Sequence, residues 1–159
     1  MIKRAEPKDA ESLVSVAVAA FHHDSVLYPA VEIGGPPGYD SPPVMRQKII
    51  EDEYYKILEG ERIIGGIVLV GMGNGHYHLD LLFISPDHHN RGIGSQAMRF
   101  IEDTYSATRW TLDTPTWAIR NIHFYEKLGY VKVGETEEED ITLIAYEKRI
   151  SESNAHALL

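Results

Sequence analysis

Residues 84–95 constrain the fold of this chain more than any other segment. An apolar strand ends there, Pro86 prevents the strand from continuing, and a helical pattern begins near Arg91. Gly92 and Gly94 lie at the first turn of that helix, where a missing Cβ lets a ligand approach the backbone. Because the N–H groups of a first helical turn attract anions, the segment predicts a diphosphate-binding loop. A role of the two glycines in turn formation and packing alone is the simpler alternative.

The hydrophobic pattern along the rest of the chain predicts helices and strands in mixed order. The glycines and prolines of residues 22–43 predict a long irregular loop, and loops of this length are usually functional or mobile. The pattern predicts an α/β fold with a mixed sheet in one domain over residues 1–150, followed by a flexible tail over residues 151–159. The expected helices cover residues 9–21, 44–52, 91–105 and 117–128, and the expected strands cover residues 2–5, 54–58, 63–70, 76–84, 109–114, 130–135 and 141–147.

The composition narrows the class of protein. Hydrophobic residues make up 43% of the chain and charged residues 25%, as in soluble globular proteins. The formal net charge is −9 and no basic patch is visible, so nucleic acid is not an expected partner. No apolar run approaches the ~20 residues of a membrane span and the first residues do not resemble a signal peptide, so we expect no membrane partner and a cytoplasmic location. The acidic charge is compatible with a cationic substrate such as an amine, although a role in solubility is the simpler explanation.

Two motifs give the chain a resemblance to a known family. Residues 89–94, His-Asn-Arg-Gly-Ile-Gly, resemble the coenzyme A loop of GNAT acetyltransferases, which reads Gln/Arg-x-x-Gly-x-Gly/Ala after a strand ending in Val/Ile-x-Pro. His89 stands where the family usually has Gln or Arg. Residues 121–130 resemble the closing motif Phe-Tyr-x-Lys-x-Gly-Phe/Tyr, and residues 2–10 match the first strand and helix. The resemblance implies the GNAT acyltransferase fold, with a mixed, mostly antiparallel central sheet of about six to seven strands flanked by about four helices.

The resemblance implies an N-acetyltransferase that moves the acetyl group of acetyl-CoA directly to a primary amine, without a covalent enzyme intermediate. In such enzymes the strand ending at residue 84 pairs with the pantetheine arm, and a backbone N–H there polarises the thioester carbonyl. Asn121 lies one helical turn before Tyr125 and could reach the cofactor, although the asparagine that the family usually uses aligns with Ala118. The residues implied to bind acetyl-CoA are Phe83, Ile84, Ser85, His89, Asn90, Arg91, Gly92, Ile93, Gly94, Ser95 and Asn121.

The chemistry also needs a proton donor and a proton acceptor. Tyr125 matches the family tyrosine that protonates the departing thiolate, and a phenol with an ordinary pKa of about 10 keeps its proton at neutral pH. The alternative interpretation of Tyr125 is a helix core residue beside Ile122 and Leu128. For the base, Asp80 stands where many family members carry an acidic residue, and Asp113 lies where some members that acetylate protein N-termini carry a glutamate. Either carboxylate could act through water, or could be a solvated strand residue.

The eight histidines raise the question of a metal site. His76 and His78 are expected on the same strand face as Asp80, with the apolar residues between them on the other face. No closed zinc spacing is present, so no metal is expected. Two other functions remain as alternatives. One is a non-catalytic module that binds or senses acetyl-CoA, and the other is a nucleotide-binding protein, which the missing Lys-Ser/Thr of a P-loop disfavours.

The expected partners are acetyl-CoA and an amine acceptor. The sequence leaves the acceptor open among small amines, aminoglycosides, amino acids, and the lysines or N-termini of proteins. Dimers are common among the chain's relatives, which leaves a homodimer open. The acidic residues 137–140 are expected at a hairpin tip, either solvated or attracting a cationic acceptor.

Overall fold

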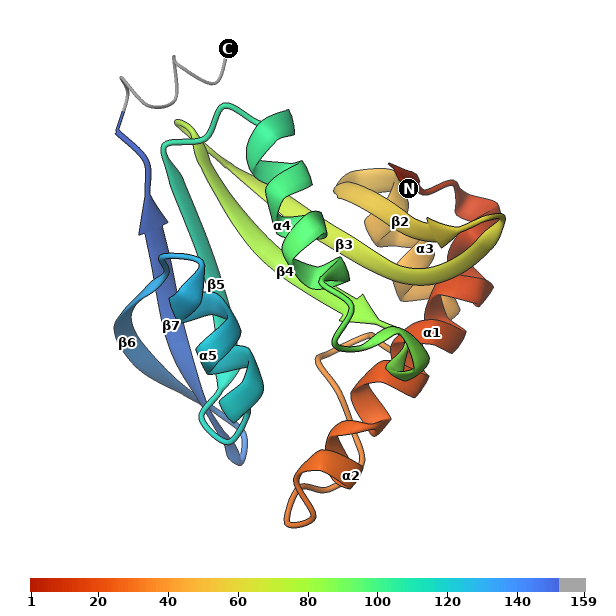
Figure 1. Ribbon diagram of the computed structural model, residues 1–159, viewed down its shortest axis with the longest axis horizontal. Coiled ribbons are helices and arrows are strands. Elements are labelled where there is room, and N and C mark those ends of the chain that lie inside the picture. The colour runs from red at the N-terminus through yellow and green to blue at the C-terminus, as the bar shows by residue number, and fades with distance from the viewer. Residues whose placement is uncertain (152–159) are drawn as a thin grey trace. The chain divides into compact units, whose positions relative to one another are not determined.

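The computed structural model describes residues 1–151, which form two compact units (Figure 1). Unit 1 comprises residues 1–70 and 81–104, and unit 2 comprises residues 71–80 together with the described residues from 105 onward. The single domain expected over residues 1–150 stays a prediction, and the expected tail lies outside the described residues except for Ser151. Within residues 1–151, no helix combines the length and the apolar character that crossing a bilayer requires.

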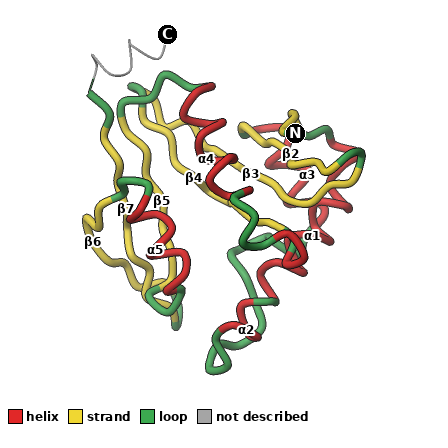
Figure 2. Tube along the Cα trace, in the orientation of Figure 1, coloured by secondary structure: helices red, strands yellow, loops and turns green. Residues whose placement is uncertain are grey.

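The strands, yellow in Figure 2, form a seven-stranded mixed sheet. Hydrogen bonds join them in the order β1-β2-β3-β4-β5-β7-β6, with β4 and β5 parallel and β1-β2, β2-β3, β5-β7 and β6-β7 antiparallel. The expected mixed, mostly antiparallel sheet is therefore confirmed. The elements are β1 (Ile2–Arg4), a 3-10 turn (Pro7–Asp9), α1 (Ala10–His22), α2 (Asp24–Leu27), α3 (Pro42–Glu51), β2 (Glu53–Glu59), β3 (Arg62–Gly73), β4 (His76–Ile84), a 3-10 turn (Pro86–His88), α4 (Ile93–Thr104), β5 (Arg109–Pro115), α5 (Ile119–Lys127), β6 (Val131–Glu138) and β7 (Ile141–Arg149).

A hydrophobic cluster holds the helices of unit 1 against its strands. Leu13 and Ala17 of α1 are fully buried because they recur on one helix face. Met45 of α3 lies in the same cluster, as do Val68 of β3 and Phe83 of β4. Burying one such large apolar side chain stabilises the fold by roughly 1.5–3 kcal/mol. The cluster therefore fixes the end of β4, from which the loop to α4 departs.

α3 begins inside the segment that the sequence predicted as an irregular loop. Ser41 Oγ accepts a hydrogen bond from Val44 N–H at 3.3 Å and caps the helix. Pro42 and Pro43 occupy the first turn, where a missing N–H is tolerated because no acceptor within the helix exists there. The expectation of irregular structure through Pro43 is therefore wrong at its C-terminal end, and the short helix α2 interrupts it as well.

Tyr39 anchors the remaining irregular segment between α2 and α3. Its hydroxyl lies 2.7 Å from His22 Nε2 on α1, within hydrogen-bond distance. Its ring meets Phe21 edge to face, with ring centroids 5.8 Å apart. A Cβ on Gly35 would lie 2.8 Å from the same ring, so glycine lets the chain pass close to it. The segment thus lacks regular structure and is still attached to α1.

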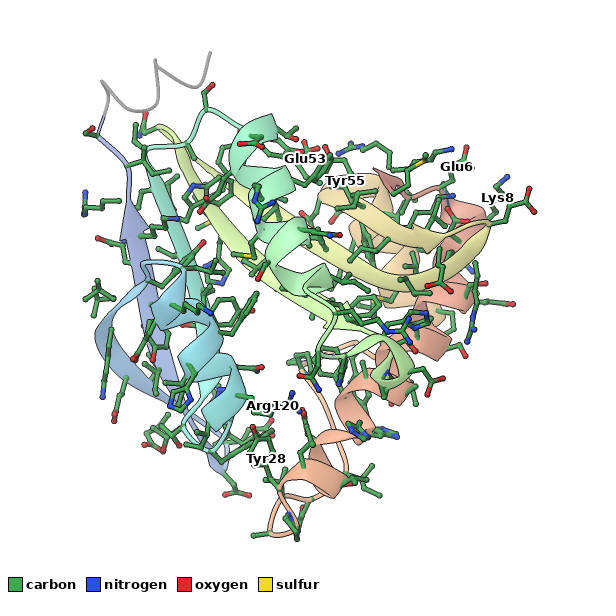
Figure 3. All side chains as sticks on the ribbon, viewed as in Figure 1. Glu6, Lys8, Tyr28, Glu53, Tyr55 and Arg120 are labelled. Atoms are coloured by element: carbon green, nitrogen blue, oxygen red, sulfur yellow. The ribbon has the colours of Figure 1, made fainter. Side chains whose placement is uncertain are left out.

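α4 packs on β2 through an aromatic contact within unit 1. Tyr55 of β2 meets Phe100 of α4 edge to face, with ring centroids 5.1 Å apart. Glu53 and Tyr55 lie two residues apart on one face of β2, where both are labelled in Figure 3. Arg4 forms an ion pair with Glu53, and its guanidinium lies 5.2 Å from the centre of the Tyr55 ring. These contacts hold α4, and with it the direction of its N-terminus.

Unit 2 buries one face of its strands beneath α5. Trp110 and Leu112 of β5 and Tyr146 of β7 are almost fully buried on this face. The Tyr146 hydroxyl donates a hydrogen bond to Glu126 Oε2 of α5 at 2.8 Å. Side chains alternate along a strand, so the residues between them, such as Thr111, belong to the opposite face. That opposite face carries the polar residues described below.

The turn between β3 and β4 is shorter than residues 71–75, which the two expected strands leave between them. Asn74 and Gly75 have φ angles of 54° and 76°, and the left-handed region is tolerated best by asparagine and glycine. The two residues therefore close the hairpin on their own. As a result β3 extends to Gly73, three residues beyond the expected end at residue 70.

Candidate functional site

The loop after β4 turns through two left-handed residues into α4. Asn90 has a φ angle of 62° and Gly92 has one of 74°. The hydrogen bond from Gln96 N–H to Gly92 O, at 3.0 Å, begins the helical ladder. The N–H groups of residues 93–95 precede that bond, so they have no acceptor within the helix. A Cβ on Gly92 would meet no atom within 4 Å, and the loop therefore presents open backbone donors at the positive end of the helix, which suits a diphosphate.

Two histidines of this loop hold its shape through side-chain contacts. His88 is 4% exposed, and its Nε2 lies 3.1 Å from Glu59 Oε2 at the end of β2. Arg91 approaches the same carboxylate at 4.0 Å. His89, expected to contact the cofactor, has its Nε2 2.8 Å from Ile84 O, within hydrogen-bond distance. Side chains of the loop therefore fix its shape around the backbone donors at the start of α4.

Two glycines of β3 fix the end of β4. A Cβ on Gly65 would lie 2.5 Å from Phe83 O, and one on Gly66 would lie 2.5 Å from the Phe83 ring. Phe83 is 3% exposed, so its side chain belongs to the core rather than to an open surface. Ser85 N–H donates to a β3 carbonyl oxygen at 2.7 Å. Because backbone groups alternate in direction along a strand, Ile84 N–H faces away from β3.

Unit 2 gathers polar side chains on one face of β4 and β5. The alternation predicted for β4 is confirmed, since Leu79 is buried while its neighbours on either side are not. The neighbouring strand has the same alternation, with Leu112 buried. The parallel register places matching positions of the two strands side by side. The residues that share the polar face are His76, His78 and Asp80 of β4 and Arg109, Thr111 and Asp113 of β5.

Thr111 lies at the centre of this polar group. Its hydroxyl oxygen is 2.7 Å from His76 Nε2 and 2.7 Å from His78 Nδ1. Arg109 NH1 lies 3.5 Å from His76 Nδ1, and His78 Nε2 lies 3.7 Å from Asp113 Oδ2. Burial and the charge of Arg109 lower the pKa of His76, so this imidazole is neutral at physiological pH. A continuous chain of polar contacts therefore reaches Asp113, whose side chain is 40% exposed.

Tyr125 lies on the buried face of α5 and is 8% exposed. Its ring meets Tyr130 edge to face, with ring centroids 5.8 Å apart. Burial raises the pKa of Tyr125, so the phenol keeps its proton throughout the physiological range. One helical turn earlier, the side-chain amide of Asn121 donates to Thr114 Oγ1 at 3.4 Å. Tyr125 thus holds the proton that a general acid needs, within a cluster of packed aromatic rings.

The predicted site residues fall into one group in each unit. Unit 1 brings together the expected cofactor residues of the segment 83–95. Unit 2 places Asp80 and Asp113 on one face of its strands and Asn121 and Tyr125 on α5. The roles of these residues toward a cofactor or a substrate stay predictions.

Three residues near these groups were not predicted. Thr111 and Arg109 join the polar face of unit 2, and the alternation Arg-x-Thr-x-Asp along β5 is the signal that could have indicated them. Glu59 contacts the loop after β4 from a distant point in the sequence, and no local pattern indicates this. In the part of the chain that the structure describes, no group of three or more His, Cys, Asp or Glu side chains is arranged to hold a metal ion.

Comparison with known proteins adds a curated relative and several solved structures. A segment of 79 residues is 37% identical to "Uncharacterized protein YrkN" of Bacillus subtilis (strain 168), a match that covers 48% of this chain and 43% of YrkN. The chain therefore spans less than half the length of that relative. The ribosomal-protein-S18-alanine N-acetyltransferase of Escherichia coli is similar in structure with a TM-score of 0.76 and 14% identity, over 95% of this chain and 94% of that one.

A second solved structure, that of the PaiA N-acetyltransferase of Thermoplasma acidophilum in complex with coenzyme A, has a TM-score of 0.72 and 17% identity. The similarity covers 94% of this chain and 98% of that one. At these identities the likeness to solved structures concerns the fold. The model of the acetyltransferase (GNAT) family matches residues 25–130, which include both the loop after β4 and the segment around Tyr125. Since this match covers more than half of the chain, the protein belongs to the GNAT family of acetyltransferases.

Proposed function

We propose that this protein transfers the acetyl group of acetyl-CoA directly to a primary amine. The observation that carries the proposal is the loop of residues 89–95, where backbone N–H groups gather at the start of α4. A diphosphate bears the charge that the N-terminus of a helix attracts, and the missing Cβ of Gly92 leaves it room to approach. The PaiA N-acetyltransferase, which has a similar fold, was solved with coenzyme A.

Ile84 is the residue of β4 that we assign to the thioester. Its N–H faces away from β3, whereas Ser85 N–H is already bonded to β3. A backbone donor that is held in place needs no reorganisation when negative charge develops on the carbonyl oxygen, and such donors stabilise the transition state strongly. In this assignment Phe83 contributes through its packing, which holds the strand end in position.

The acceptor amine enters as an ammonium ion and loses two protons during the reaction. A carboxylate, Asp80 or Asp113, takes the first proton directly or through water, and the free amine then attacks the carbonyl carbon. The C–N bond forms, and the C–S bond breaks when the tetrahedral intermediate collapses. Tyr125 gives its phenolic proton to the departing thiolate and regains the second proton of the amine. The products are the amide, the thiol of coenzyme A and one proton released to solvent.

The alternative is a module that binds or senses acetyl-CoA without turnover. Such a module needs the phosphate loop, but it needs neither a protonated phenol nor exposed carboxylates. Tyr125 is present with its proton held, and the Asp113 side chain is 40% exposed. These features favour the enzyme over the sensor.

A thiol-release assay tests the proposal. Acetyl-CoA is offered with a small amine, an aminoglycoside, an amino acid, a peptide with a free N-terminus, and a lysine peptide with a blocked N-terminus. We expect at least one class to release thiol faster than acetyl-CoA hydrolyses, with the acetylated product identified by mass spectrometry. Calorimetry with coenzyme A is run in parallel. Binding without thiol release by any class supports the sensor, and absence of binding overturns both functions.

A further inference from the structure

The polar chain on the face of unit 2 bears on which group accepts the proton of the amine, a question that rests on the proposed function. We propose that His78 is a positioning residue, which directs its Nε2–H at Asp113 and so makes that carboxylate, rather than the imidazole, the proton acceptor of the acetyl transfer. The donors and acceptors along the chain of contacts fix the tautomer of His78 from both ends.

The first end of the chain is Arg109. Its Nε donates to Glu147 Oε2 at 2.7 Å, and the Glu147 side chain is only 13% exposed, so the guanidinium is held in place. A guanidinium has donors and no acceptor. Since Arg109 NH1 lies 3.5 Å from His76 Nδ1, this ring nitrogen has to be the acceptor. A neutral His76 then carries its proton on Nε2 and donates it to Thr111 Oγ1 at 2.7 Å.

The hydrogen bond from His76 to Thr111 also sets the direction of the hydrogen bond between Thr111 and His78. A threonine hydroxyl has a single O–H to donate. Having accepted from His76, Thr111 donates that O–H to His78 Nδ1, which lies 2.7 Å away. The Nδ1 atom of His78 is then an acceptor, and the proton of the neutral ring is on Nε2.

The other end of the chain leads to the same tautomer. Asp113 Oδ2 lies 3.7 Å from His78 Nε2. An unprotonated Nε2 would turn its lone pair toward a carboxylate oxygen, which is repulsive, whereas Nε2–H is attracted to it. A distance of 3.7 Å is longer than a full hydrogen bond, so the attraction is that of a dipole for a nearby charge, and it orients the half-exposed carboxylate.

The tautomer decides what His78 and Asp113 can do. The lone pair of His78 Nδ1 is occupied by the Thr111 hydroxyl, and its Nε2 already carries a proton. In this tautomer the imidazole has no lone pair to offer an ammonium ion. Asp113 is approached by His78 at Oδ2, which leaves its second carboxylate oxygen to take the proton of the amine directly or through water.

Nuclear magnetic resonance tests the hydrogen-bond chain without a substrate. Long-range proton–nitrogen correlation at neutral pH distinguishes the two tautomers of each histidine. We expect both His76 and His78 to carry the proton on Nε2 and to have an unprotonated Nδ1. A proton on Nδ1 of His78 would overturn the proposal, whatever the activity of the protein.

Three substitutions of His78 test the positioning role in the acetyl transfer. The amide nitrogen of Gln reaches about as far as Nε2 of histidine, that of Asn about as far as Nδ1, and Leu has no donor. We expect His78→Gln to keep kcat within about threefold of wild type. His78→Asn and His78→Leu should lower kcat about tenfold or more, with KM for acetyl-CoA nearly unchanged. Asp113→Asn should lower kcat at least as much as His78→Leu.

The outcomes separate this inference from the proposed function. If His78→Leu keeps the wild-type kcat, or if Gln and Asn lose activity equally, His78 does not act by directing a donor at Asp113. If Asp113→Asn keeps the wild-type kcat, the base is another group. If the wild-type protein binds coenzyme A but releases no thiol with any amine, the proposed function fails and the role of Asp113 as acceptor falls with it, even where the tautomers are as expected.

Discussion

In each unit an aspartate lies beside a nitrogen-bearing side chain, and the two pairs differ in how far water can reach them. In unit 1, Lys56 Nζ lies 2.8 Å from Asp9 Oδ2, and only 15% and 11% of the two side chains are exposed. The N–H of Glu6 donates to the same carboxylate oxygen at 2.8 Å. In unit 2, His78 and Asp113 lie 3.7 Å apart, with 28% and 40% of their side chains exposed. The Asp9–Lys56 pair is therefore closed to water, whereas the carboxylate of Asp113 is open to it.

This difference suits the two purposes that we assign to the aspartates, one structural and one catalytic. Burial by itself would raise the pKa of Asp9, but the hydrogen bonds from Lys56 and from the Glu6 backbone outweigh burial and lower it. Asp9 is therefore locked in its ionised form, which suits a structural role at the start of α1. Asp113 keeps access to water, as the base in the proposed reaction requires. An aspartate that is to act as a base has to remain partly unsatisfied in the resting protein.

The largest effect, on the free energy of unfolding, should come from removing Asp9 from its pair with Lys56. Asp9→Ala leaves the Lys56 ammonium buried without its partner, and we expect the free energy of unfolding to fall by about 3 kcal/mol. Equilibrium unfolding in urea measures this. Glu11→Ala, an exposed carboxylate in the first turn of the same helix, is the matched control, and its effect should stay below about 1 kcal/mol.

The pH dependence of the same variant sharpens the test. Because the pKa of Asp9 is lowered on folding, the ionised carboxylate stabilises the folded state. Its contribution is complete at neutral pH and is lost as the pH falls through the acidic range to below the folded pKa. The difference in unfolding free energy between wild type and Asp9→Ala should therefore shrink on acidification. A difference that stays constant from neutral to acidic pH would contradict the closed ion pair.

In unit 2 the next largest effect should appear in turnover and leave stability nearly intact. Tyr125→Phe keeps the ring and its packing and removes only the proton donor, so we expect kcat to fall about tenfold or more with a competent amine. KM for acetyl-CoA and the melting temperature should stay close to wild type. Tyr130→Phe, which removes a hydroxyl from the neighbouring ring, is the control and should keep kcat. An unchanged kcat for Tyr125→Phe, where chemistry limits the rate, would make Tyr125 a core residue only.

Unit 1 is expected to bind coenzyme A through backbone N–H groups. A single added side chain should therefore suffice to weaken that binding. Gly92 has a φ angle of 74°, and any branched side chain would strain it whether or not a ligand binds. Gly94 lies within α4 and has no positive φ, which makes Gly94→Val the cleaner change. We expect coenzyme A to bind at least about tenfold more weakly, about 1.4 kcal/mol, by calorimetry. Gln96→Val, in the same helix, is the control, and equal affinity for both folded variants would contradict the phosphate loop.

The smallest effect concerns the irregular segment of unit 1. Tyr39→Phe removes the hydroxyl that lies 2.7 Å from His22 Nε2 and keeps the ring against Phe21. A hydrogen bond of this kind is worth about 1 kcal/mol, so the amides of Gly35 and of residues 38–41 should exchange about fivefold faster. The amides of α3 serve as the internal reference and should not change. If the exchange of both segments is unaltered, the contact does not restrain the segment.

The fold was largely predictable because its elements carry local signals. Alternating apolar residues indicated β4 at its observed bounds, and the helical spacing of Leu13, Ala17 and their neighbours indicated α1. The errors arose where a residue has two uses. Prolines often mark the end of a helix, but Pro42 and Pro43 follow the N-cap Ser41 and begin α3. The deciding interaction there is the cap from Ser41, which a periodicity argument does not consider.

The candidate site was predictable where it is continuous in sequence, as in residues 83–95. The polar face of unit 2 was predictable only in part. The alternation along β4 placed His76 and His78 together, but the contact with Thr111 depends on the register between β4 and β5. The support of Arg109 by Glu147 depends in turn on the register between β5 and β7. Registers between distant strands are set by the whole sheet, so no local pattern could have given this chain of contacts.

The adjacent glycines of β3 limit how the loop after β4 could be moved or redesigned. Grafting residues 83–95 onto another scaffold would transfer the motif but not the surface beneath it. On a host strand with ordinary side chains, Cβ atoms at the positions of Gly65 and Gly66 would occupy the space of the Phe83 carbonyl and ring, 2.5 Å away. The strand would shift outward and carry the loop with it. A functional transplant therefore has to include the glycine pair, and a library that varies this protein should leave both positions fixed.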